Sequence, residues 1–195
     1  MTFDNVCTRY LVFLAVLFEE VAFCLPQIGS SKPTDISATW ARYLKEPLGG
    51  PSPLGLNTKR DKLYEMVSSK AAARLKEIDP NEKPEHTTAM AIENAQKACA
   101  ALVTAINPQQ TGVQLLLYFD EAHPLTTIYL PGTSQPHYYA LRHTFTNLTN
   151  IFVIFLSTTS ALSKLATPAT RHPSTRVTGG NATLRAPFAE FTLQL

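Results

Sequence analysis

The stretch Leu115-Leu116-Leu117-Tyr118-Phe119-Asp120-Glu121 decides the fold that this sequence predicts. Its five apolar residues do not alternate with polar ones, a pattern typical of a strand buried on both faces of a parallel sheet. Carboxylates do not belong inside such a sheet. They belong beyond the carboxyl end of the strand, in the crevice where open α/β sheets bind their ligands. We therefore expect Asp120 and Glu121 to emerge together at one edge of a sheet.

A second apolar run, residues 151–156, leads into the hydroxyl-rich segment 157–160. Between the two runs, apolar residues from Tyr138 to Leu148 recur at spacings of three and four, which predicts one face of a helix. A strand, helix, strand unit crosses over right-handedly and makes its two strands parallel. The hydroxyls are therefore expected to share one crevice with the two acids.

Adjacent acids at the end of a buried strand are the arrangement of a Walker B motif. In a nucleotide-hydrolysing site the first acid holds Mg²⁺ through its water shell, and the second orients or deprotonates the attacking water. Asp120 is the candidate for the metal and cofactor-binding role, and Glu121 for the catalytic role. Ser157 and Thr158 are candidates for sensor 1, a polar residue that contacts the attacking water or the γ-phosphate. In the alternative interpretation the acids are solvated where an ordinary strand ends, and the hydroxyls cap the next helix.

The motif that grips phosphate is missing from the sequence. No Gly-x-x-x-x-Gly-Lys-[Ser/Thr] series occurs in the 195 residues, so the backbone cradle and its lysine have no counterpart. The stretch 29–34 has one glycine, and a proline where helix amides would face phosphate. We expect the later part of a nucleotide-hydrolysing domain, with the phosphate loop either upstream of this start or lost.

The chain resembles a group of uncharacterised fungal proteins built on a P-loop ATPase domain of the AAA or STAND type. The resemblance covers most of the chain, more closely after Asn107. It rests on the early apolar helix 10–18, the strand end with Asp-Glu-Ala-His, the segments 139–145 and 154–159, and the tail 171–188. It implies a partial P-loop-like parallel sheet, ATP and Mg²⁺ as ligands, and truncation after the phosphate loop.

Two arginines in the tail are weaker candidates. In related ATPases an arginine in this neighbourhood can reach the γ-phosphate of a neighbouring subunit, which makes Arg176, with Arg171 beside it, a candidate for nucleotide binding. A surface turn with two solvated arginines is the simpler interpretation.

Other functional classes fit less well. Asp-Glu-Ala-His is also a helicase signature, but a helicase core needs a phosphate loop and a second recombinase-like domain, and this length has room for neither. Net charge +2, with 17 dispersed Lys and Arg residues, gives no clear footprint for nucleic acid. The three cysteines have no metal or redox spacing, and we expect them to be core thiols in a reducing compartment.

Residues 1–107 are predicted to form a helical region with loops near 47–58 and 79–87, and residues 108–195 the α/β core portion. The helices expected are a heavily buried one over 6–21, a short one over 35–44, an amphipathic one over 63–78, and one that starts near Thr87 or Thr88 and carries an alanine-rich stripe for close packing. The uninterrupted apolar core 11–18 falls short of the ~20 residues of a membrane span, so no span is expected.

A secretory signal is the minority alternative for the N-terminus. Arg9 precedes the apolar core and Ala22 and Cys24 follow it, but acidic residues weaken the pattern. The sequons at Asn147 and Asn181 matter only in that case. We expect an intracellular, cytoplasmic protein.

Three functions are therefore compared. The leading hypothesis is a truncated or degenerate P-loop ATPase-like protein, an enzyme only if a phosphate loop is supplied upstream. The alternative is a non-catalytic α/β interaction module that binds a protein partner or forms an oligomer, and a secreted glycoprotein ranks third. A sheet that lacks its phosphate-loop strand would expose apolar edges and faces, which invite pairing with another chain.

Overall fold

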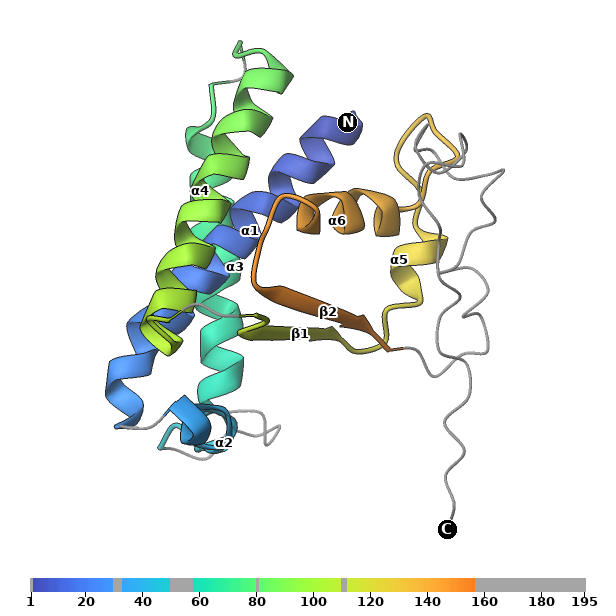
Figure 1. Ribbon diagram of the computed structural model, residues 1–195. Coiled ribbons are helices and arrows are strands. Elements are labelled where there is room, and N and C mark those ends of the chain that lie inside the picture. Colours follow the sequence, from blue (N-terminus) through green and yellow to red (C-terminus); the bar gives the residue numbers. More distant parts are fainter. Residues whose placement is uncertain (1, 30–32, 50–57, 80, 110–111, 157–195) are drawn as a thin grey trace. The chain divides into compact units, whose positions relative to one another are not determined.

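The computed structural model describes residues 2–29, 33–49, 58–79, 81–109 and 112–156 (Figure 1). The chain is mixed α/β, which confirms the general fold class, whereas the P-loop-like arrangement stays a prediction. Its elements are α1 (Phe3–Cys24), η1 (Leu25–Ile28), α2 (Pro33–Lys45), α3 (Lys59–Glu77), α4 (Pro84–Ile106), β1 (Leu115–Phe119), α5 (Pro124–Thr127), α6 (His137–Phe145) and β2 (Ile151–Phe155).

The chain divides into two compact units. The first comprises the described parts of Met1–Leu117 and Tyr139–Phe152 and contains the main helices, and the second comprises those of Tyr118–Tyr138 and Val153–Leu195. Both strands pass from one unit into the other, so each unit contains one half of the strand pair.

Helix α1 is the central element of the first unit. Its N-terminus is capped by Thr2, whose hydroxyl accepts a hydrogen bond from the Asn5 amide at 3.3 Å. The helix packs on α4 and on α3 (Figure 1), and this confirms the expected heavily buried helix. Its buried residues are Val6, Cys7, Thr8, Leu11, Leu14, Ala15, Val16, Phe18, Glu20 and Cys24.

Helix α4 presents the predicted stripe of small residues to the core. Ala91, Ala95 and Ala98 are all buried and belong to the same hydrophobic cluster as Leu14 and Phe18 of α1. The start predicted at Thr87 or Thr88 was too late, because α4 begins at Pro84. Proline is favoured in the first turn, where its missing N–H loses no intrahelical bond.

Helix α3 begins with a capping box. Thr58 Oγ1 accepts from the Asp61 amide, and the Asp61 carboxylate accepts from both the Thr58 hydroxyl and its backbone N–H. These bonds lower the pKa of Asp61. The buried residues Leu63, Val67 and Ala71 follow at a spacing of four and turn one face of α3 toward Val16 of α1, as the amphipathic pattern predicts.

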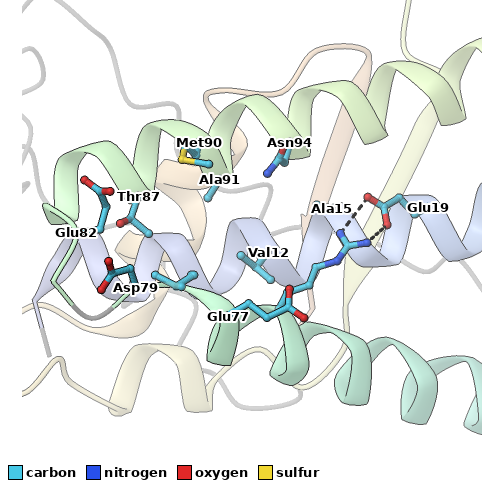
Figure 2. A pocket seen from close by; sticks show the side chains of 12 residues that line it. Val12, Ala15, Glu19, Glu77, Asp79, Glu82, Thr87, Met90, Ala91 and Asn94 are labelled. Atoms are coloured by element: carbon cyan, nitrogen blue, oxygen red, sulfur yellow. Dashed lines mark hydrogen bonds and ion pairs between the residues drawn. The ribbon is translucent and has the colours of Figure 1, made fainter.

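Two ion pairs join α1 to α3. Glu20 is buried in α1 and pairs with Lys70, while the Arg74 guanidinium donates two hydrogen bonds to the Glu19 carboxylate (Figure 2). The bonds to Glu19 are the largest influence on Arg74 and raise its pKa. Lys70 thus satisfies the buried Glu20 carboxylate, as buried charge requires, whereas the pair of Glu19 and Arg74 is more exposed to solvent.

One helix bears on the expectation that the chain has no membrane span. Within the described residues, one helical segment of 26 residues, Phe3–Ile28, is sufficiently long and apolar to cross a bilayer. The sequence-based count considered only the uninterrupted run 11–18, whereas a long helix tolerates a few charges. A core helix of a soluble protein and an N-terminal signal sequence have the same properties.

Strands β1 and β2 pair in parallel. Leu115 N donates to Asn150 O at 3.1 Å and Leu156 N donates to Phe119 O at 2.8 Å, so the register advances in the same direction along both strands. Leu115, Leu117 and Ile151 belong to or pack against the helical core. The parallel pair confirms the order of strand, helix and strand.

Burial on both faces of β1 was predicted and is wrong. Leu116 and Tyr118 are each 61% exposed and Phe152 in β2 is 55% exposed, which leaves one sheet face open within the described residues. An uninterrupted apolar run gives no information about how many faces are covered. The crossover helix is also shorter than predicted, because α6 ends at Phe145, although Leu148 in the following turn is still buried.

Candidate functional site

The ends of the two strands meet in the second unit. Leu156, the residue after β2, donates its amide to Phe119 O at 2.8 Å and accepts the Ala122 amide at 2.7 Å. The acidic turn that follows β1 is therefore hydrogen-bonded to the carboxyl end of β2. Parallel pairing brings both strand ends to one edge, as the sequence predicts.

Asp120 and Glu121 occupy this turn, and both are exposed. Asp120 Oδ1 accepts the Glu121 amide at 3.0 Å, which fixes the first carboxylate against its own backbone. Glu121 has φ +51°, in the left-handed region that is uncommon for residues other than glycine. Both acids therefore lie beyond the end of β1 and face solvent.

His123 is a neighbour that sequence reasoning did not connect with the acids. Its Nδ1 lies 3.2 Å from Glu121 Oε2, which is ion-pair distance without hydrogen-bond geometry, and this nitrogen is shielded from solvent. Its carbonyl accepts from the Thr126 amide at 3.0 Å and the Thr126 hydroxyl at 2.8 Å at the start of α5. The histidine therefore links the Glu121 carboxylate to the short helix α5. The sequence signal that could have linked them is the spacing of two residues between Glu121 and His123, directly after a predicted strand.

The remaining candidates fall outside the described residues. Ser157 and Thr158 directly follow Leu156 in the sequence, and Arg171 and Arg176 come later in the chain. The sensor role of the hydroxyls and the nucleotide-binding role of the arginines stay predictions.

The turn supplies the carboxylate of Asp120, and carboxylate oxygen is the type of protein ligand that Mg²⁺ takes. Among the described residues, no group of three or more His, Cys, Asp or Glu side chains is placed to hold a metal ion. Mg²⁺ usually keeps several waters and uses one or two carboxylates together with substrate phosphates. A single exposed carboxylate such as Asp120 matches that mode.

The three cysteines are free and buried, as predicted for core thiols. Burial is the main cause that raises the pKa of Cys7 to about 12 and that of Cys99 to about 11. Their thiols donate to Ala140 O at 3.8 Å and Thr149 O at 3.6 Å. They have no feature of a reactive site, because a nucleophilic cysteine needs a lowered pKa and access.

We expect native Cys7 and Cys99 to resist alkylation at pH 8, because the thiolate is the reactive form and both are buried thiols. Iodoacetamide labelling followed by peptide mass spectrometry measures this, with the same protein in guanidinium chloride as the control that labels fully. Equal labelling rates with and without denaturant would show that these residues are not in a folded core.

No known protein family, no curated protein and no solved structure matches this chain. Its function is therefore inferred from its own residues and their geometry.

Proposed function

We propose that this chain is an ATPase-like protein in which the turn after β1 is the Walker B part of a Mg²⁺-nucleotide site, of which these 195 residues do not contain the phosphate loop. The supporting observation is the hydrogen-bonded meeting of the acidic turn with the end of β2, through Leu156 N to Phe119 O and Ala122 N to Leu156 O. Nucleotide sites of α/β sheets form at such an edge.

In this proposal the two acids have different roles. Asp120 would hold Mg²⁺, which would supply positive charge to offset that of the nucleotide phosphates. Glu121 orients or accepts a proton from the attacking water. His123 at 3.2 Å restrains the Glu121 carboxylate, so it is a positioning residue for that base.

The site lacks the group that grips phosphate, since no glycine-rich loop with lysine occurs in the 195 residues. Phosphoryl transfer depends almost wholly on positioning and electrostatic stabilisation, and much of the positioning comes from that loop. The chain by itself is expected to bind ATP weakly and to hydrolyse it negligibly.

A titration with a fluorescent ATP analogue tests the proposal. We expect binding with a dissociation constant of about 1 mM or weaker, dependent on Mg²⁺ and reduced in Asp120→Asn. Glu65→Gln, which removes an exposed carboxylate from α3, is the control and should leave binding unchanged. Micromolar affinity would contradict the proposal that the site is incomplete. Weak binding that changes neither with Mg²⁺ nor in Asp120→Asn would contradict the role proposed for Asp120.

The second candidate is a non-catalytic interaction module. The exposed apolar residues Leu116 and Phe152 of the first unit favour it, because apolar side chains in contact with solvent commonly mark an interaction site. In this case Asp120→Asn and Glu121→Gln together would leave every measurable activity intact.

A secreted glycoprotein ranks third. The Asn147 side-chain amide donates to His143 O at 3.3 Å, so the nitrogen that would carry a glycan is hydrogen-bonded to the end of α6. Asn181 lies outside the described residues. Intact-mass analysis of the cellular protein distinguishes this candidate, since glycans on Asn147 or Asn181 would support secretion.

A further inference from the structure

The end of α2 and the start of α3 form one continuous surface of the first unit. Helix α2 packs against both α3 and η1. Pro47 and Thr58 form an antiparallel bridge, and the Lys59 amide donates to Glu46 O at 2.9 Å. The Lys59 ammonium also lies 4.1 Å from the centroid of the Tyr43 ring. Two segments that are apart in the sequence are thus held side by side, next to the end of α1.

Four basic side chains on this surface are exposed and form no ion pair with another described residue. Arg42 and Lys45 are three positions apart in α2 and therefore lie on one face of that helix. Arg60 and Lys62 lie near the start of α3. We call these four residues the basic surface.

The neighbouring acids offset this charge only in part. Glu46 pairs with Lys59, and the Asp61 carboxylate accepts two hydrogen bonds from Thr58 in the capping box. Residues 42–46 and 59–65 together carry five basic and three acidic side chains, a net charge of +2. The N-terminus of α3 adds the positive end of its helix dipole, where cations are normally disfavoured. The region therefore has a positive potential that the protein itself does not neutralise.

Exposed aromatic side chains accompany the basic surface. Phe23, two residues before η1, is 69% exposed, and Tyr64, four positions after Arg60 on the same face of α3, is 50% exposed. Trp40 of α2 is half-buried and stacks on Tyr43 with ring centroids 5.4 Å apart. Basic residues beside exposed aromatic ones are typical of a surface that binds in the headgroup region of a bilayer.

We propose that this region binds the surface of an anionic lipid bilayer. The basic surface pairs with the anionic headgroups, while Phe23 and Tyr64 enter the headgroup region. A net charge of +2 is small for nucleic acid, whose binding depends on many phosphate contacts, whereas a bilayer also takes up the aromatic side chains. Helix α1 stays in the folded bundle, so the protein lies on the bilayer. This surface is independent of the proposed nucleotide site.

Sedimentation of the full chain with lipid vesicles tests the proposal. We expect binding to vesicles of phosphatidylcholine with phosphatidylserine that is about tenfold tighter or more than binding to phosphatidylcholine alone, and that is weakened by salt. Trp40 is the single tryptophan of the chain. Its fluorescence emission should therefore shift to shorter wavelength on binding and be quenched by brominated lipid.

The double variant Arg42→Gln and Lys45→Gln is expected to weaken binding to the anionic vesicles about tenfold. The matched control is Lys76→Gln with Lys83→Gln, which removes two exposed charges at the other end of α3 and before α4. Phe23→Ala should weaken binding severalfold, because it removes an exposed apolar side chain from the surface. Circular dichroism checks that all variants fold.

Four results would each overturn the proposal. They are equal binding to both kinds of vesicle, equal effects of the two double variants, Trp40 emission that does not change with anionic vesicles, and binding to single-stranded RNA without binding to vesicles.

Discussion

Replacing Phe18 by alanine is expected to destabilise the protein by about 3–5 kcal/mol, because it removes a large side chain from a packed core and leaves a cavity. Phe18 is 1% exposed and belongs to the cluster that joins α1 to α4 and the start of β1. The measurement is guanidinium chloride unfolding followed by far-ultraviolet circular dichroism.

Phe23→Ala is the matched control for Phe18→Ala, because it makes the same change on the same helix. Phe23 is 69% exposed, so its replacement should change the free energy of unfolding by no more than about 0.5 kcal/mol. Equal effects of the two substitutions would mean that α1 does not pack as described.

Enlarging Ala95 to leucine is expected to destabilise the protein by about 1–3 kcal/mol or more, because α4 has no room there for a longer side chain. Ala95 is fully buried in the cluster that joins α1 and α4. Thermal unfolding measures the effect, and Ala100→Leu on the exposed side of α4 should be nearly neutral. If Ala95→Leu stabilised the protein, the small-residue packing of α4 would be refuted.

The helices were largely predictable because their signals are local. The spacing of Leu63, Val67 and Ala71 requires one buried face, and the alanines of α4 indicate close approach of another helix. The start of α4 was placed too late because hydroxyl residues suggested a cap, whereas Pro84 fits the first turn equally well.

The environment of the strands was less predictable. The residue types of Leu116 and Tyr118 do not show whether another helix or strand packs on their side of the sheet, because that depends on the rest of the chain. Their alternation with Leu115 and Leu117 is visible only in three dimensions.

Part of the candidate site followed from chain order, since parallel strands bring their carboxyl ends to one edge and place Asp120 and Glu121 there. The approach of His123 to Glu121 did not follow. It depends on the local turn, in which Glu121 has φ +51°, and no spacing rule encodes that conformation.

The two glutamates of α1 also determine what insertion of this helix into a lipid bilayer would require. Lys70 and Arg74 belong to α3, so a departing α1 would leave both cations behind and carry Glu19 and Glu20 without them into hydrocarbon. Carboxylates at that depth are costly. The ion pairs with α3 therefore favour the folded bundle over insertion of α1.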